Sequence, residues 1–250
     1  MKTAGLTATG LVRSHNEDTI FSTTSQIGPL PNLFIVADGM GGHNAGEVAS
    51  AKSVEYFCEF ICAQHKAIAT QESAVSLLVA AIKFANQKVY THSLESLELS
   101  GMGTTFSACA VLDGKLAIAH IGDSRIYTVA KGQIAQITTD HTYVEEMIQA
   151  GHLTSKDAKT HPNRNQLTRV LGCRPPIDVD GALYDLSKTD SVLLCSDGLT
   201  DMLLDEEILN IASQNTPPQD RGQALIDAAN RNGGIDNISV IIIDVKGETN

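Results

Sequence analysis

The stretch TTFSACAVLDGKLAIAHIGDSRIYTVAKGQIAQITTDH, residues 104–141, decides the fold class of this chain. Its apolar residues form short alternating runs, which is the pattern of half-buried strands. Asp113-Gly114 and Lys131-Gly132 lie between these runs, where two-residue hairpin turns are expected. We therefore predict an antiparallel meander over this stretch.

The segments on both sides of the meander add strands and helices. Upstream, three short strands precede two neighbouring helices, the second with apolar residues at the i, i+3, i+4, i+7 spacing. Downstream, strands precede two further helices, and a β-branched strand closes the chain. The expected strands are 5–10, 18–22, 33–37, 177–184, 191–195 and 238–245, and the expected helices are 45–64, 74–89, 199–212 and 219–231.

Strands and helices do not alternate strictly, which favours two packed antiparallel sheets over a doubly wound parallel fold. We expect an α+β fold of four layers, an α-β-β-α sandwich with helix pairs on both sides. No repeat or linker divides the 250 residues, so 1–250 is predicted to be a single domain. Residues 142–174 are polar and interrupted by Gly and Pro, which predicts a surface insertion with short helices, a flap.

Composition excludes several classes of function. Acidic residues outnumber basic ones by 29 to 18, the formal charge is −11 and no basic run stands out, which argues against nucleic acid. The start of the chain has no signal-peptide core, and the apolar runs are far shorter than a ~20-residue membrane span. Five cysteines without a CxxC pair fit reduced thiols, and Cys58 and Cys62 without a nearby His make a poor zinc site. We expect a cytoplasmic protein without a membrane anchor.

Three Asp residues lie at the ends of apolar strands. Asp38 and Asp197 each follow such a strand, and Asp236 precedes one. A carboxylate beside an apolar core is costly unless it is paired or coordinated. Hard oxygen ligands suit Mg²⁺ or Mn²⁺, so the pattern favours a divalent cation site.

Each Asp also has a simpler interpretation. Asp-Gly is the commonest hairpin signal, and Asp113 is assigned to a turn because alternating strands lie on both sides of it. An Asp before a helix is often an N-terminal cap. The simpler interpretation weakens because Glu17, Asp18 and Asp123 repeat the same kind of position.

The chain carries seven short motifs in a fixed order. They are Arg13-Ser-His-Asn-Glu-Asp18, Val36-Ala-Asp-Gly-Met-Gly-Gly-His43, Gly103-Thr-Thr105, Ile121-Gly-Asp-Ser-Arg125, Thr139-Asp-His141, Cys195-Ser-Asp-Gly-Leu-Thr200 and Gly234-Ile-Asp-Asn-Ile238. This set resembles that of the bacterial metal-dependent Ser/Thr protein phosphatases of type 2C, the PPM family. The resemblance implies a β-sandwich flanked by helix pairs and hydrolysis of phosphoserine and phosphothreonine in proteins.

The resemblance also implies two Mn²⁺ or Mg²⁺ ions. Asp38 would bridge them, Asp197 and Asp236 would bind the first, and the Gly39 carbonyl would bind the second.

Three further acidic residues match metal positions of the family. Glu17 and Asp18 match an acidic pair near the second ion, which they would bind directly or through water. Bacterial members often hold a third ion, and Asp123 matches its ligand, shared with Asp197.

A pair of cations implies how the reaction proceeds. Two divalent ions ~3.5 to 4 Å apart lower the pKa of a bridging water, and the resulting hydroxide attacks phosphorus in line. No side-chain nucleophile is needed, and Ser196 lacks a GxSxG elbow around it.

Two other side chains are expected to contact the substrate. Arg13 suits bidentate binding of the phosphate, the alternative being a surface ion pair with Glu17. His43 suits protonation of the leaving seryl or threonyl oxygen, the alternative being a structural role. His120 and His141, within or at the end of strands, are interpreted as structural.

The expected partners are phosphorylated protein substrates and, by the family resemblance, a bacterial Ser/Thr kinase, with the chain a monomer. Two other functions remain open: a non-catalytic phosphoprotein-binding module, and a metal hydrolase acting on nucleotides or sugar phosphates. The presence of Arg13, Asp38, Asp197 and Asp236 favours catalysis over the first.

Overall fold

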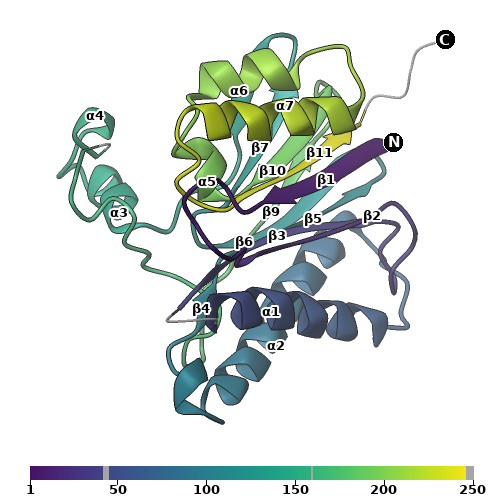
Figure 1. Ribbon diagram of the computed structural model, residues 1–250. Helices are drawn as coiled ribbons and strands as arrows, with labels where there is room; N and C mark the ends of the chain where they lie inside the picture. The colour runs from purple at the N-terminus through teal and green to yellow at the C-terminus, as the bar shows by residue number, and fades with distance from the viewer. Residues whose placement is uncertain (42–44, 159, 246–250) are drawn as a thin grey trace.

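The computed structural model describes residues 1–41, 45–158 and 160–245. Two antiparallel sheets lie face to face, and helices cover the outer face of each, which gives four layers (Figure 1). The expected α+β sandwich of two antiparallel sheets is confirmed.

The first sheet joins the two ends of the described chain. Its strand order is β1-β11-β10-β7-β8. The strands are β1 (Lys2–Ala8), β11 (Ile238–Asp244), β10 (Ser191–Cys195), β7 (Arg125–Ala130) and β8 (Gln133–Gln136). β1 pairs with β11 so that Ala8 lies opposite Ile238. The segment that follows β1 and the segment that precedes β11 therefore meet at the same end of this sheet.

The second sheet places the apolar run 33–37 at an interior position. Its strand order is β2-β3-β5-β6-β9, and β4 also pairs with β3. The strands are β2 (Asp18–Thr23), β3 (Leu33–Met40), β4 (Gly103–Thr104), β5 (Phe106–Leu112), β6 (Lys115–Ile121) and β9 (Asp180–Asp185). Residues 33–37 are fully buried because both faces of β3 are covered.

Helix pairs form the outer layers (Figure 1). The second sheet is covered by α1 (Ala45–Cys62) and α2 (Gln71–Ser93), and the first by α5 (Asp197–Thr200), α6 (Asp205–Ala212) and α7 (Pro218–Arg231). A short helix, η1 (Leu97–Leu99), follows α2. The insertion 142–174 carries α3 (Tyr143–Gln149) and α4 (Ser155–Ala158), which lie to one side of the sandwich (Figure 1).

Both predicted hairpin turns are present. Asp113 and Gly114 have φ angles of 46° and 75°, and Lys131 and Gly132 have φ angles of 45° and 77°. Positive φ at both central positions is typical of the type I′ turn, whose twist matches that of the flanking strands.

The predicted meander is wrong in one respect. The β5–β6 hairpin belongs to the second sheet and the β7–β8 hairpin to the first, because the chain crosses between the sheets over residues 122–124. Gly122 has a φ of 107° at this crossing. Local alternation identifies a strand but does not reveal the sheet that it joins.

Three element boundaries also differ from expectation. Strand β3 continues to Met40, so Asp38 lies within it, and β9 begins only at Asp180. The predicted helix 199–212 is divided into α5 and α6. The backbone N–H of Leu204 donates to Glu207 Oε2 at 2.9 Å, which caps the N-terminus of a separate helix α6. None of the helices in the described ranges is long and apolar enough to cross a membrane.

Candidate metal centre

The alternation of side chains in β3 carries Asp38 toward the space between the sheets. Phe34 and Val36 pack in the apolar layer between the two sheets, so Asp38, two residues further on, points the same way. Asp18 lies directly opposite Asp38 in the register of β2 and β3. Its neighbour on the same face of β2, Ile20, packs against that apolar layer. Two carboxylates are thus placed side by side at one end of the layer.

Ser196, directly after β10, links the two sheets at this point. Its hydroxyl donates to Asp18 Oδ2 at 2.8 Å and accepts from the backbone N–H of Ser239 at 2.9 Å. The residue is fully buried. The sequence suggested no role for Ser196 beyond a rejected nucleophile, because its partner lies 178 positions away.

Asp197 and Asp236 approach the centre from the first sheet. Asp197 is the first residue of α5, directly after Ser196, and Asp236 precedes β11. A side chain at position 198 would collide with the carbonyl oxygen of Asn237, so only Gly198 allows this close approach. The N-cap of α5 is Ser196, so the interpretation of Asp197 as an N-terminal cap is wrong.

Asn237 holds the loop after β1 against the segment before β11. Its side-chain amide donates to the carbonyls of Thr9 and His15 at 3.0 and 2.9 Å, and its Oδ1 accepts from the backbone N–H of Glu17 at 2.8 Å. Its own backbone N–H donates to Asp236 Oδ1 at 2.8 Å. The sequence contained this Asn within a motif but gave no signal of what it positions.

Glu17 and Gly39 lie against the start of α1. A Cβ atom on Gly39 would collide with the carbonyl oxygen of Gly46 and lie 2.6 Å from that of Glu17. The Glu17 carboxylate in turn lies beside Gly46, where Oε1 is 2.7 Å from the position that a Cβ would take. Gly39 is therefore required by close packing, and the Glu17 side chain is held within the same corner.

Arg13 pairs with Asp236 and not with Glu17. Its Nη2 lies 2.7 Å from Asp236 Oδ2, and its side chain is 51% exposed. The expected alternative, a surface pair with Glu17, is therefore wrong in its partner. Arg13 is accessible to a phosphate once it leaves this carboxylate.

The carboxylates at this end of the layer, which are buried or half-buried, oppose one another's ionisation. Burial, the largest cause, raises the pKa of Asp18 to about 6 and that of Asp197 to about 7. Burial and then the neighbouring charges of Asp18, Asp197 and Asp123 raise the pKa of Asp38 well above its usual range. Burial and the charge of Asp197 do the same for Asp123. Such a group of carboxylates needs a cation to ionise together at neutral pH.

This donor set fits hard divalent cations. Every donor is an oxygen, and Asp18 Oδ1 is buried without a hydrogen-bond partner. In residues 1–41, 45–158 and 160–245, no three His, Cys, Asp or Glu side chains are arranged to hold an ion as they stand. The Asp236 carboxylate is bound to Arg13.

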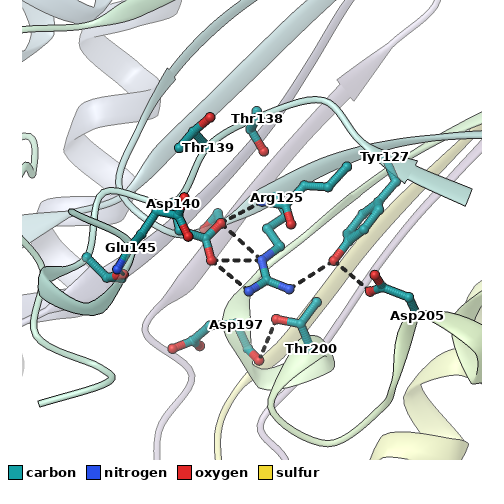
Figure 2. A network of polar contacts seen from close by, with 12 residues as sticks. Arg125, Tyr127, Thr138, Thr139, Asp140, Glu145, Asp197, Thr200 and Asp205 are labelled. Atoms are coloured by element: carbon teal, nitrogen blue, oxygen red, sulfur yellow. Dashed lines mark hydrogen bonds and ion pairs between the residues drawn. The ribbon is translucent and has the colours of Figure 1, made fainter. Parts of the chain in front are cut away.

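Asp123 lies where the chain crosses from β6 to β7. Arg125, two residues further on, is part of a network of polar contacts (Figure 2). Arg125 binds the Asp140 carboxylate through Nε at 3.0 Å and Nη2 at 2.6 Å, and its Nη1 donates to the Tyr127 hydroxyl at 3.0 Å. That hydroxyl donates to Asp205 Oδ1 at 3.3 Å. The network connects the segment before the flap to α6. Burial and the charges of Asp197 and Asp140 raise the pKa of Asp123, and the Arg125 charge opposes this rise only in part.

The sequence singled out three histidines, His43, His120 and His141. His43 lies outside the described residues. His120 and His141 are buried, with ring centroids 4.9 Å apart, and His120 bonds to the Ser107 hydroxyl at 2.9 Å and the Thr139 carbonyl at 3.1 Å. These contacts support the structural interpretation of both.

Comparison with known proteins identifies the family. A family model described as protein phosphatase 2C matches residues 12–219. The serine/threonine phosphatase stp of Listeria welshimeri is 35% identical over 237 residues, which covers 94% of this chain and 92% of that protein.

Solved structures agree with this result. Stp1 from Staphylococcus aureus, a serine/threonine phosphatase, has a TM-score of 0.91 at 35% identity and covers 99% of this chain and 96% of its own. The catalytic domain of the phosphatase PstP, solved in complex with 2 manganese ions, has a TM-score of 0.82 at 31% identity, covering 97% of both chains. The chain therefore belongs to the protein phosphatase 2C family and is a metal-dependent protein serine/threonine phosphatase.

Proposed function

We propose that this enzyme removes phosphate from phosphoserine and phosphothreonine by direct attack of water at a centre of two Mn²⁺ or Mg²⁺ ions. The observation that carries the proposal is the group of carboxylates at one end of the layer between the sheets, which oppose one another's ionisation. Asp18 is buried, and Asp38, Asp123 and Asp197 are half-buried. Hydrogen bonds from Ser196 to Asp18 and from Asn237 to Asp236 hold these carboxylates in position.

The chain would hold the cations through oxygen atoms from both sheets. Asp38 would contact both ions, Asp197 and Asp236 the first, and the Gly39 carbonyl the second. When bound, such a pair supplies a water molecule acidic enough to attack phosphorus at neutral pH.

Three other acidic residues complete the proposed site. Glu17 and Asp18 would lie near the second ion, directly or through water. Asp123 and Asp197 would share a third ion.

Arg13 and His43 are proposed to act on the substrate. Arg13, exposed beside Asp236, would bind two phosphate oxygens and offset their repulsion from the carboxylates. His43 would give a proton to the departing seryl or threonyl oxygen.

The proposal extends to the organisation of the chain, its substrates and its compartment. We propose that residues 1–250 form one phosphatase domain with residues 142–174 as a flap, acting as a monomer. The substrates would be targets of a bacterial Ser/Thr kinase in the cytoplasm, a compartment compatible with five free cysteines.

A single experiment tests the proposed centre. Hydrolysis of p-nitrophenyl phosphate and of a phosphothreonine peptide is measured with Mn²⁺, with Mg²⁺ and with EDTA, for wild type and Asp38→Asn. We expect activity only with a cation, and a loss of at least about 100-fold in the variant, because the carboxylate proposed to contact both ions is removed. Glu59→Gln, on the exposed face of α1, changes the charge equally and is the control. Turnover in EDTA, or full activity of Asp38→Asn, would refute the centre.

A further inference from the structure

A groove of about 690 Å³ separates the flap from α5 and α6. Its flap wall includes Val144, Glu145 and Ile148 from α3. The opposite wall is formed by residues 200–206. We call this space the flap groove. At its inner end it is lined by Asp123 and Asp197, so it is continuous with the candidate metal centre.

The flap groove is strongly acidic. Among the described residues it is lined by seven acidic side chains and two arginines. Arg125 is already bound to Asp140, and Arg164 lies where its charge lowers the pKa of Asp201. Glu145 lines the groove from α3 and Glu206 lines it from α6.

Exposed apolar side chains gather at the same place. Leu204 is 61% exposed and Ile235 is 45% exposed, and both line the flap groove. Leu11 is 68% exposed and its backbone N–H bonds to the Gly234 carbonyl at 2.7 Å, next to Ile235. Val12, 67% exposed, then leads to Arg13. Exposed apolar side chains beside acidic ones, next to the residue proposed to bind phosphate, form a surface suited to a protein segment.

We propose that the flap groove binds the stretch of the substrate protein that flanks the phosphorylated residue, and that it selects Lys or Arg there. The inference rests on the proposed function, because it places the phosphate at the inner end of the groove. A basic side chain in the groove would lie near Glu145, Asp201 or Glu206, and its aliphatic stem would contact Leu204 or Ile235. An acidic flanking residue would instead be repelled by the same side chains.

The test compares phosphothreonine peptides of equal length whose flanking positions are Lys, Gln or Glu. Each exposed charge pair is expected to change kcat/KM by roughly 2- to 5-fold, so two or three flanking lysines should give roughly a 10- to 50-fold preference over the Glu peptide. High salt should reduce the preference, because exposed charges are screened. p-Nitrophenyl phosphate has no flanking residues to occupy the groove between α3 and residues 200–206, so its hydrolysis reports on the centre alone.

Variants in the groove separate this inference from the proposed function. Glu145→Gln combined with Glu206→Gln should reduce the preference for the Lys peptide and leave p-nitrophenyl phosphate hydrolysis unchanged, whereas the control Glu59→Gln should change neither. Glu145→Lys combined with Glu206→Lys should reverse the preference, which an impaired fold could not do. The proposed role of the flap groove would be refuted if the Glu145→Gln, Glu206→Gln variant kept the preference for the Lys peptide, or if wild type had equal kcat/KM for all peptides. Failure of every substrate, p-nitrophenyl phosphate included, would overturn the proposed function instead.

Discussion

Replacing Asp18 by Asn should stabilise the protein when no metal is present. The Asp18 carboxyl is 8% exposed, its Oδ1 has no hydrogen-bond partner, and burial raises its pKa from 3.8 to about 6. Below pH 3.8 the group is protonated in both the folded and the unfolded chain, so it costs nothing. As the pH rises toward and past 6, the unfolded chain ionises more readily than the folded one, and stability is lost.

The size of the effect follows from the shift in pKa. A difference of roughly two units corresponds to about 3 kcal/mol once the group is fully ionised. Asn is uncharged at every pH and keeps an oxygen that accepts from the Ser196 hydroxyl. In EDTA the free energy of unfolding of Asp18→Asn should therefore exceed that of wild type by about 3 kcal/mol at pH 8 and by less than about 1 kcal/mol near pH 4.

Urea unfolding followed by far-ultraviolet circular dichroism, in EDTA between pH 4 and pH 8, measures this difference. Glu59→Gln serves as the control for charge alone. Addition of Mn²⁺ should narrow the gap, because a cation offsets the repulsion only where the carboxylate is present. Equal stability of variant and wild type at pH 8, or a gain of the same size at pH 4, would refute the reasoning.

Two further substitutions test other parts of the site. Arg13→Lys keeps the charge but not the paired donors, so kcat/KM for a phosphothreonine peptide should fall by roughly 10-fold with little change in the unfolding midpoint; an unaltered kcat/KM would contradict the phosphate role. His120→Gln should remove a pH effect, because burial lowers the pKa of His120 to about 4 and only the unfolded chain is protonated between pH 7 and pH 5. Over that range wild type should lose about 2 kcal/mol relative to the variant in urea unfolding, and parallel pH profiles would contradict this.

Those parts of the fold that depend on local signals were predictable from the sequence. The turns at Asp113-Gly114 and Lys131-Gly132 follow from residues that tolerate positive φ between alternating runs. The strand around Leu33–Met40 follows from a continuous apolar run. The assignment of the two hairpins to different sheets was not predictable. The apolar and polar residues alternate in the same way before and after the crossing at Gly122, so the pattern does not show that the chain changes sheet.

The same distinction applies to the candidate site. Acidic residues beside apolar strands are visible in the sequence, and register brings Asp18 and Asp38 together. The partners that hold them are not visible, because Ser196 and Asn237 act across gaps of about 180 to 230 positions. The pairing of Arg13 with Asp236 likewise depends on the meeting of two distant loops.

The pairing of the first strand with the last has a consequence for the order of synthesis. β1 is synthesised before the other strands of this fold but gains its neighbour β11 only when residues 238–244 emerge from the ribosome. Asp236 and Asn237, and with them the anchor for the loop that carries Arg13, arrive at the same late moment. A nascent chain that lacks residues 236–244 would carry most of the acidic side chains without the contacts that hold them together, so hydrolytic activity should be absent until these residues have been synthesised.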